Sequence, residues 1–452
     1  MPRSGSRVRA LLSVLILPLA GCGAGSHPSH QGHRPAGAHV TIHVPADAPT
    51  ISAGVSLAKP GDLVLVAAGV YHEPVRITTP QITLRGESRE QVVIDGQLQQ
   101  PDGVVVTAPG VAVENLTVRN NIQNGILVTG SAKAAAAVTG KEGGYDTGDE
   151  PVTFLNSFLV SSVTATRNGL YGIYAFSAQN GVIEHSYVSG GADSGIYVGQ
   201  CKPCRIVVRD NIAELNAVGY EGTNASGDMY VVGNRLVGNR VGLTTDSDHQ
   251  EKLLPQQGAT VVGNLIAANQ QSATPEQADG GWGFGIGIDG VSAIRFLRYR
   301  ISGISDAGVV ITATQDIPPD GNQLLDNTFA GNGTDVGSVF PNATVGHGNC
   351  VQGNGLRTAP AELGTTAACP PAGQSPPAAN QSPTPSGTWK APTPPPGIPF
   401  TDVAAPPAQP QFPNAAGAPA TVVPAVPALP DVAGVQVPAP SLLAASALIP
   451  AS

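Results

Sequence analysis

A repeat near the centre of the chain limits its possible folds more than any other feature. Residues 206–225 read IVVRDNIAELNAVGYEGTNA, and residues 229–249 read MYVVGNRLVGNRVGLTTDSDH. The two lines align without gaps and share Asn211 with Asn234, Asn216 with Asn239, and Gly219 with Gly242. One such unit cannot bury its apolar side alone, so repeated units are expected to stack along an axis.

Each unit contains a short apolar strand before its first Asn and a second strand after its Gly. We therefore expect an all-β fold, a parallel β-helix in which each unit is one coil of a solenoid. Stacked Asn side chains can hydrogen-bond to the coils above and below, which predicts an Asn ladder. The predicted ladder positions are Asn115/Asn120, Asn211/Asn216, Asn234/Asn239, Asn264/Asn269 and Asn327/Asn332. Other coils break the pattern at Val163/Asn168, His185/Gly190 and Tyr299/Ile304.

The first coils have a signature of their own. An early Pro49 and one apolar helical face of Ile51, Val55 and Ala58 predict a short capping helix over the open end of the stack. Strands are expected over residues 63–66, 75–77, 82–84, 92–94 and 104–106. The run VPADAPTISAGVSLAKPGDLVLVAAGVYHEPV resembles the opening segment of pectin-lyase-like right-handed β-helix proteins, including the NosD-like group. This resemblance covers residues 40–356. It implies a single-stranded right-handed parallel β-helix with carbohydrate as ligand, and it implies no particular reaction.

The two ends of the chain differ from the repeat. Residues 1–21 combine a basic start with an apolar run too short to span a bilayer, and Leu19-Ala20-Gly21-Cys22 resembles the lipobox of bacterial lipoproteins. The resemblance implies cleavage before Cys22 and a diacylglycerol anchor. We expect this lipid to be the only attachment to the membrane, at the extracytoplasmic face. The alternative is an ordinary signal peptide with a chance Cys.

The rest of the chain divides into a tether, a domain and a tail. Residues 22–39 form a flexible tether whose His residues are either a weak metal-binding tract or part of a solvated linker. Residues 40–369 form the β-helix domain. Residues 370–452 are rich in Pro and Ala, and we expect a disordered, extended and solvated tail.

The Cys residues other than Cys22 are expected to form two disulfides, Cys201–Cys204 and Cys350–Cys369, because an even number in an exported protein suggests pairing. A redox pair in the first of these, or a four-Cys zinc site, is the alternative. Several coils of about 4.8 Å separate the two pairs, which argues against the zinc site. The formal net charge of −9, with 12 % charged residues, argues against nucleic acid as a partner, and we expect a monomer.

The strand that follows the Gly of each unit alternates between two faces. Its first and third positions are mostly apolar and are expected to point inward, so its second and fourth positions face outward. The second-position column reads Leu127, Tyr174, Tyr197, Glu221, Thr244, Gly287 and Val310. The fourth-position column reads Thr129, Phe176, Gly199, Thr223, Asp246, Asp289 and Thr312. Tyrosines therefore stand on neighbouring coils and are followed by carboxylates on the next coils.

The carboxylates of this face, Glu221, Asp246 and Asp289, are the candidate catalytic residues. Asp246 and Asp289 would lie about 5 Å apart and Glu221 roughly 8 Å from Asp246, near the carboxyl separations of retaining and inverting glycosidases. Close carboxylates also raise one another's proton affinity, as a general acid requires. No cofactor is expected to be required and no metal ligand set is predicted, although calcium is an alternative occupant of the acidic face.

Aromatic and polar side chains around the carboxylates are candidate substrate-binding residues, because flat aromatic faces suit sugar rings. They are Tyr174, Tyr197, Asp248, His249 and Trp282. Insertions at residues 131–153 and 270–284 leave the stack beside this face and can form a binding rim. The alternative is an ordinary solvated strand face with turn dipeptides and cross-strand tyrosine packing.

These observations favour a lipid-anchored surface protein that binds a polysaccharide or cell-wall glycan, and they leave open whether it also cleaves or epimerises that glycan. A second hypothesis is a non-catalytic spacer or adhesion scaffold, which predicts no concave groove on the outward face. A third is NosD-like metal maturation, which the scarcity of Met and free Cys argues against. The motifs of particular family members are missing, including the paired Asp and Gly-His-Gly of polygalacturonases.

Overall fold

The computed structural model describes residues 39–136, 151–278, 280–340, 344–353, 355–365, 369–370 and 382–443. The predicted signal peptide, Cys22, most of the tether and parts of the tail lie outside the described residues. In the part of the chain that the structure describes, no helix has the length and apolar character needed to cross a membrane.

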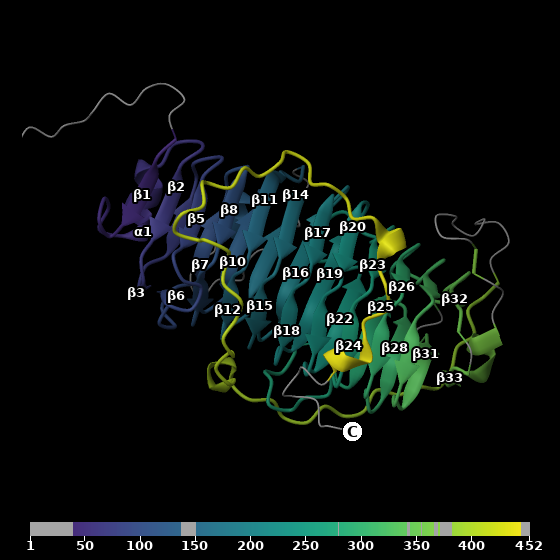
Figure 1. Cartoon of the computed structure of the whole chain (residues 1–452). Coiled ribbons are helices and arrows are strands. Elements are labelled where there is room, and N and C mark those ends of the chain that lie inside the picture. Colours follow the sequence, from purple (N-terminus) through teal and green to yellow (C-terminus); the bar gives the residue numbers. More distant parts are fainter. Residues whose placement is uncertain are drawn as a thin grey trace, which may run out of the picture. The chain divides into compact units, whose positions relative to one another are not determined.

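The domain is built from three parallel sheets (Figure 1). Sheet A has the order β1 (Thr41–Val44), β2 (Leu63–Val66), β5 (Thr83–Gly86), β8 (Val111–Glu114), β11 (Leu155–Ser161), β14 (Ala178–Glu184), β17 (Ile206–Arg209), β20 (Met229–Val232), β23 (Thr260–Val262), β26 (Arg295–Leu297), β29 (Gln323–Leu325), β32 (Cys350–Val351). Sheet B has the order β3 (Gly69–Tyr71), β6 (Val92–Asp95), β9 (Thr117–Arg119), β12 (Thr164–Thr166), β15 (Tyr187–Ser189), β18 (Ile212–Glu214), β21 (Arg235–Val237), β24 (Leu265–Ala267), β27 (Arg300–Ser302), β30 (Thr328–Ala330). Sheet C has the order β4 (Val75–Ile77), β7 (Asp102–Val106), β10 (Asn124–Thr129), β13 (Ile173–Phe176), β16 (Ser194–Cys201), β19 (Val218–Ala225), β22 (Val241–Asp246), β25 (Phe284–Asp289), β28 (Ala307–Thr312), β31 (Thr334–Val339), β33 (Thr358–Ala359).

Each strand pairs in parallel with the strand three places further along the chain through most of the stack. One coil therefore contributes one strand to each sheet, which is the parallel β-helix that the repeat predicted. The inward positions are mostly Val, Ile, Leu and Ala, and they join into one apolar core from Ile42 to Leu363. These residues favour strands, because β-branched side chains pack well on a pleated, buried surface.

The Gly at the second residue of β19, β22 and β25 is required by the closeness of neighbouring coils. A Cβ on Gly219 would lie 2.5 Å from the carbonyl oxygen of Gly242 and 2.9 Å from the Asn239 amide nitrogen. A Cβ on Gly242 would lie 2.5 Å from the Gly285 carbonyl oxygen, and a Cβ on Gly285 would lie 2.5 Å from the Gly308 carbonyl oxygen. A side chain at this position would push successive coils apart, so the repeat retains Gly there.

The predicted Asn ladder is present in the central coils. The Asn234 side chain accepts from the Asn211 amide at 3.0 Å and donates to the Asn264 carbonyl oxygen at 2.9 Å. A second column joins Asn216, Asn239 and Asn269 in the same manner.

In two coils the ladder residues lie one position later in the sequence than the repeat pattern predicted. Asn121, rather than Asn120, bonds to Asn168 at 2.9 Å. In the coil of residues 185–190 the ladder positions are Ser186 and Gly191, whose backbone amides donate to Asn211 and Asn216. The residues that the pattern predicted for the ladder in these two coils include Asn115, Asn120 and His185. Each of these three residues has a positive φ and forms the turn just before the observed ladder position. Asn tolerates this left-handed conformation, so the Asn spacing alone could not separate the turn from the ladder.

Short helices lie beside the first coils and the middle of the stack. Helix α1 (Ile51–Leu57) caps the first coils as predicted, although Thr50 is its N-cap and Pro49 precedes it. The Glu73 carboxylate accepts from the amides of Ile51 and Ser52, which satisfies the exposed N-terminus of the helix. Helix α2 (Ala132–Ala135) follows β10, and a 3₁₀ turn covers Ala361–Thr365.

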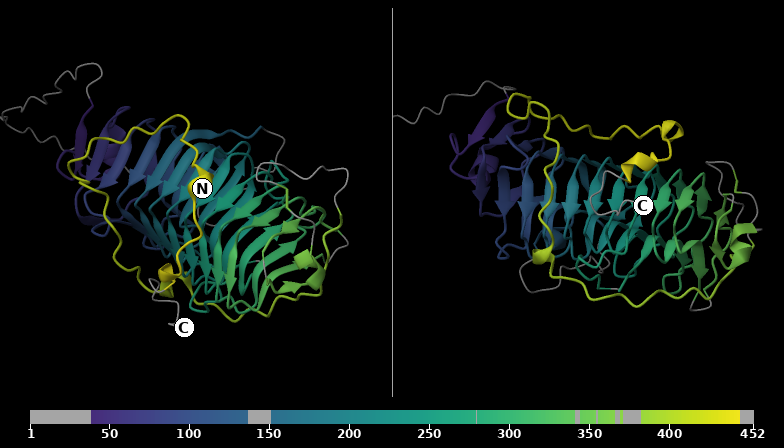
Figure 2. Two further views of the ribbon diagram at one scale, coloured as in Figure 1. Left: turned by 45° about the vertical axis from the view of Figure 1, so that its right-hand side comes forward. Right: turned by 60° about the horizontal axis from the view of Figure 1, so that its bottom comes forward.

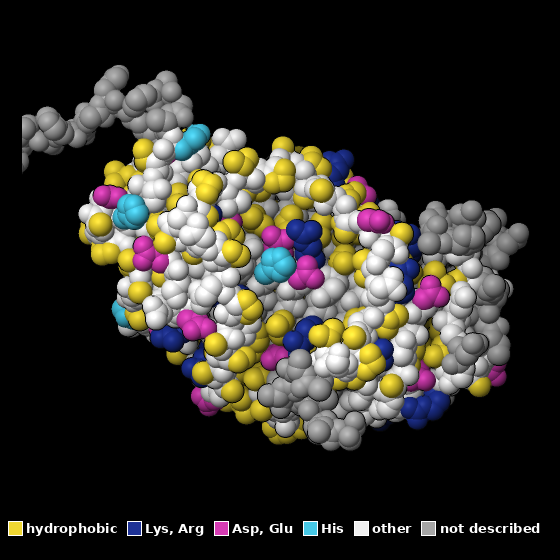
Figure 3. All heavy atoms as spheres, viewed as in Figure 1, with side chains coloured by type: hydrophobic (Ala, Val, Ile, Leu, Met, Phe, Trp, Pro, Cys, Tyr) yellow, Lys and Arg dark blue, Asp and Glu magenta, His cyan; other side chains and the backbone are white. Residues whose placement is uncertain are grey.

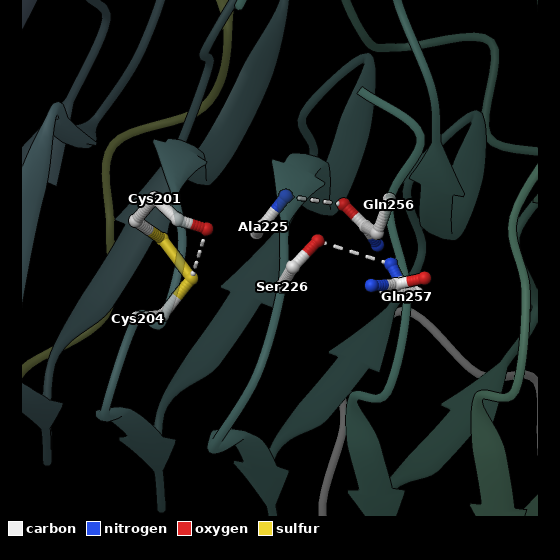
Figure 4. The surroundings of a disulfide bond; sticks show 6 residues. All are labelled: Cys201, Cys204, Ala225, Ser226, Gln256 and Gln257. Carbon is white, nitrogen blue, oxygen red and sulfur yellow. Dashed lines mark hydrogen bonds between the residues drawn. A yellow bond between two sulfur atoms is a disulfide. The ribbon is translucent and has the colours of Figure 1, made fainter. Parts of the chain in front are cut away.

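Both pairs of Cys form disulfides, Cys201–Cys204 and Cys350–Cys369. Cys201 ends β16 and Cys204 precedes β17, and the bridge lies beside the turn of the next coil at Ala225 and Ser226 (Figure 4). Cys201 and Cys204 are both fully buried in the apolar core. Burial keeps an attacking thiolate away from the sulfurs, so the position suits a structural bridge better than redox exchange.

The C-terminal segment, defined here as residues 382–443, has no regular secondary structure beyond 3₁₀ turns at Phe400–Asp402, Val432–Gly434 and Pro440–Leu442. Its composition predicted this lack of helix and strand. The structure differs from the expectation of a solvated chain, because the segment passes over the outside of the β-helix and contacts coils far apart in the stack (Figures 1 and 2).

Arginine side chains of the β-helix hold the C-terminal segment by donating to its backbone carbonyls. They are Arg85, Arg89, Arg167, Arg240, Arg298 and Arg300. A Pro-rich chain offers these acceptors because Pro has no N–H and an extended backbone makes few bonds to itself. Composition showed that the segment could not form its own core, and it could not show that another surface would bind it.

Candidate functional site

The predicted outward columns of sheet C are present in the register of the structure. Glu221 pairs with Tyr197 on β16 and with Thr244 on β22. Asp246 pairs with Thr223 on β19 and with Asp289 on β25. The inward neighbours Leu243 and Ile286 lie in the apolar core. The alternation of the strands therefore places the three candidate catalytic carboxylates on the outer side of three successive coils.

These carboxylates line a pocket of about 670 Å³ on the outer face of sheet C. Its lining includes Glu221, Asp246, Asp289, Asp248 and Asp193. The volume lies within the range of small-ligand sites. Within the described residues, no Lys, Arg or His side chain lines this pocket. The spacer hypothesis predicted no concave groove here, and the outer face has one.

Burial dominates the electrostatics of the central pair. It raises the pKa of Asp289 to about 7. Burial also raises the pKa of Asp246 well above its ordinary value, and the neighbouring Asp289 carboxylate raises it further. The Thr223 hydroxyl donates to Asp246 at 2.9 Å and opposes that rise. Such a pair holds a proton near neutral pH, where isolated carboxyls are ionised.

Two tyrosines that the sequence predicted as an exposed sugar platform are buried instead. Tyr174 is 9 % exposed and Tyr197 is 3 % exposed. Both belong to an apolar cluster with Tyr171, whose ring centroid lies 4.5 Å from that of Tyr174, and the cluster includes Ala134 of helix α2. The side chains do point outward from the strands, as expected, but their rings pack against Tyr171, which precedes β13, and against each other at a centroid distance of 5.0 Å. Tyr197 still reaches the pocket lining, while Tyr174 does not.

The other candidate binding residues divide in a similar way. Asp248 and Trp282 line the pocket. The Trp282 ring lies under the Arg240 guanidinium, whose carbon is 4.9 Å from the ring centroid. His249 is exposed, is not part of the pocket lining, and pairs with Asp316 at 2.9 Å.

Sequence reasoning missed several residues of the site. Asp193 precedes β16, so it belongs to no strand column. Glu251 is buried beside the pocket, where it accepts a hydrogen bond from the Tyr197 hydroxyl. Trp389 lines the pocket from the C-terminal segment. Only the rarity of Trp, with two in the whole chain, gave a signal for Trp389.

Calcium was an alternative occupant of this acidic face. Within the described ranges, no group of three or more His, Cys, Asp or Glu is arranged to hold a metal ion.

Comparison with known proteins agrees with the fold. Residues 102–266 match the family model described as "Right handed beta helix region". The chain is a right-handed parallel β-helix protein. No curated protein matches its sequence.

Solved structures similar to this β-helix protein are distant from it in sequence. The A-module of a mannuronan C-5 epimerase from Azotobacter vinelandii is 16 % identical with a TM-score of 0.43, covering 67 % of this chain and 88 % of that chain. The enzymatically active domain of tailspike protein 2 from bacteriophage CBA120 is 11 % identical with a TM-score of 0.41, covering 66 % and 40 %. An alginate lyase from Paenibacillus sp. is 14 % identical with a TM-score of 0.37, covering 64 % and 97 %.

Proposed function

We propose that this β-helix protein binds a neutral polysaccharide in the sheet C pocket and hydrolyses it with the carboxyl pair Asp246 and Asp289. The observation that supports this most directly is the register of the two residues on adjacent strands, within one pocket that also contains Trp282. Neighbouring strands lie about 4.8 Å apart. This spacing is close to the separation of about 5–5.5 Å between the two catalytic carboxyl groups of retaining glycosidases.

The raised pKa values of Asp246 and Asp289 support complementary roles for the two carboxyls. One carboxyl keeps its proton and donates it to the glycosidic oxygen as the carbon–oxygen bond breaks. The ionised partner attacks the anomeric carbon and forms a glycosyl ester. A water molecule then hydrolyses that ester, and the first residue, now ionised, removes the proton from this water.

Glu221 supports the pair from the preceding coil. It lines the same pocket and lies on the strand before β22. A carboxylate at this place would stabilise the positive charge that develops on the sugar ring in the transition state.

The charge of the pocket favours a neutral glycan over a polyuronate. Its lining is acidic, and in the described part of the chain it contains no cationic side chain. A chain of carboxylated sugars would be repelled by these groups. Epimerisation or lyase chemistry on uronates would need a cation beside the substrate carboxylate, and added calcium is therefore a separate arm of the test.

A reducing-sugar assay with the full-length protein tests the proposal. The substrates are xylan, mannan, mixed-linkage glucan and alginate, each with calcium or with a chelator. We expect activity on a neutral glycan, a loss of about a hundredfold or more for Asp246→Asn and Asp289→Asn, and a smaller loss for Glu221→Gln. The exposed Asp326 lies outside the pocket, and Asp326→Asn serves as the control. Equal activity of the control and both pocket variants would exclude this pair as the catalytic groups.

We also propose that Cys22 carries a lipid that anchors the protein at the extracytoplasmic face of the cell membrane. The support is the run Leu19-Ala20-Gly21-Cys22 after a short apolar stretch. Metabolic labelling with an alkyne fatty acid should mark the protein, and Cys22→Ala should abolish the label. A labelled Cys22→Ala protein would contradict this assignment.

A further inference from the structure

The C-terminal segment reaches the same pocket as the acidic pair. Trp389 and Ala391 line the pocket together with Trp282. These two tryptophans are the only ones in the sequence, and they come from distant parts of the chain. The Trp389 indole donates to Asp306 at 3.4 Å and lies 3.7 Å from the position of a Cβ on Gly337 of β31. An aromatic side chain from outside the stack therefore rests on the outer face of sheet C.

Backbone contacts fix the chain before Trp389. The amide of Gly387 donates to the Ser338 carbonyl at 2.8 Å, and Ser338 donates to the carbonyl of Pro385. The amide of Thr384 donates to the Gly346 carbonyl at 2.7 Å. These bonds tie the segment to the end of β31 and to the loop that follows it.

A second set of contacts fixes the chain after Trp389. Arg240 donates to the Pro395 carbonyl at 2.6 Å, and the same guanidinium covers the Trp282 ring. The amide of Gly397 donates to Glu276 at 2.8 Å, and the amide of Ile398 donates to the Thr274 carbonyl at 2.9 Å. Both of these partners belong to the insertion that carries Trp282.

More distant anchors continue along the same segment. Arg85 is fully buried and donates to the carbonyls of Ala418 and Pro419 at 2.8 and 3.0 Å. Its guanidinium lies 4.7 Å from the centroid of the Phe412 ring. On the face shown in Figure 3 charged side chains are scattered among apolar and neutral atoms, so hydrogen bonds to carbonyls account for this attachment better than a charged patch does.

We propose that residues 384–398 form a fixed wall of the glycan pocket and that Trp389 is a substrate-binding residue acting together with Trp282. This inference rests on the proposed function, and it adds a subsite built from the C-terminal segment. Aromatic rings pack against the apolar faces of sugar rings, and two rings near the acids would position the bond to be cleaved. The ligand class is a neutral oligosaccharide long enough to contact both indoles.

Binding is measured with full-length proteins that carry Asp289→Asn to prevent turnover. The probes are xylohexaose, mannohexaose and cellohexaose, and their binding is measured by isothermal titration calorimetry. We expect Trp389→Ala to raise Kd about tenfold or more, as for other buried aromatic contacts, and Trp389→Phe to restore part of the affinity. Phe412→Ala is the matched control, because it removes an aromatic contact of the same segment outside the pocket. Equal affinity of the parent and Trp389→Ala would overturn the substrate-binding role, and an equal loss in Phe412→Ala would reduce it to general attachment of the segment.

A second measurement, made without any glycan, tests whether residues 384–398 hold Trp389 against the β-helix. Trp282→Phe leaves Trp389 as the single tryptophan. Its fluorescence should be quenched by acrylamide several-fold less efficiently than that of free N-acetyltryptophanamide, because the side chain is partly buried. Quenching as efficient as that of the free compound would overturn the wall. Should the parent bind none of the oligosaccharides while Trp389 stays shielded, the proposed function and the substrate-binding role both fail and the wall alone stands.

Discussion

Asp246 and Asp289 are register partners at the ends of β22 and β25, and both side chains line one pocket on the outer face of sheet C. Burial raises the pKa of both carboxyls, to about 7 for Asp289. This placement brings a stability cost with it, because the folded protein must hold the two acids close together in a partly buried position.

The first prediction concerns the pH dependence of stability. Asp289 has a pKa of about 7 in the folded protein and an ordinary value of 3.8 in the unfolded chain. Between these values the folded protein binds more protons, so the free energy of unfolding should fall as pH rises from about 4 to 7, by at most about 1.4 kcal/mol per pH unit from this group. Asp289→Asn should flatten this slope in urea unfolding at pH 4, 6 and 8. Asp326→Asn should keep the parental slope, and a parental slope in Asp289→Asn would contradict the raised pKa.

The second prediction concerns the Asn ladder. Asn234 accepts from the backbone and side-chain amides of Asn211 and donates to Val208 and Asn264. Because Asn234→Ala leaves these buried partners unsatisfied, it should lower the free energy of unfolding by about 1–3 kcal/mol. Urea denaturation checks this, with the exposed Gln99→Ala as the control. A change in Asn234→Ala no larger than that of the control would show that the ladder does not stabilise the stack.

The third prediction concerns Arg85, which donates to Glu114 at 2.8 Å in a pair that solvent does not reach. Arg85→Met should cost about 3–5 kcal/mol, because it leaves the Glu114 carboxylate buried without its cation. It should also make the C-terminal segment more sensitive to limited proteolysis, since Arg85 donates to three of its carbonyls. The matched control is Arg205→Met, which removes an exposed pair at 3.9 Å and should cost less than about 1 kcal/mol. Unchanged proteolysis in Arg85→Met would show that this residue does not hold the segment.

The fourth prediction concerns Tyr197, whose hydroxyl donates to the buried Glu251. Tyr197→Phe removes this donor and should destabilise the protein by about 1–3 kcal/mol. It should also raise the pKa of Glu251 further, since this bond opposes the effect of burial. Thermal unfolding of Tyr197→Phe can be compared with that of Tyr230→Phe, a partly exposed tyrosine on sheet A. Equal stability of the two variants would mean that the hydrogen bond contributes nothing.

Local patterns were sufficient to predict the β-helix and the outward columns of sheet C. Each coil must approach the next closely, and for this reason Gly and Asn recur at a fixed spacing, as at Gly219, Gly242 and the Asn residues between them. This spacing in the sequence therefore predicts the register of the coils. Alternation along each strand then decides which side chains leave the core. The columns that contain Glu221, Asp246 and Asp289 followed from these two rules alone.

The positions of Tyr174 and Trp389 could not be predicted in the same way. Tyr174 points outward as its column requires, and it is buried in a cluster with Tyr171, which lies outside the strand columns, and with Ala134 of helix α2. Trp389 reaches the pocket because arginines and loop carbonyls bind a Pro-rich segment that has no periodicity of its own.

The sequence by itself determined the stack, its register and the row of acids, because each of these depends on neighbouring coils with the same spacing. Only the tertiary structure decided that the row is a pocket, that two tyrosines are covered, and that the C-terminal segment supplies a wall. Those features depend on contacts between segments far apart in the chain, and such contacts follow no repeat that a single sequence displays.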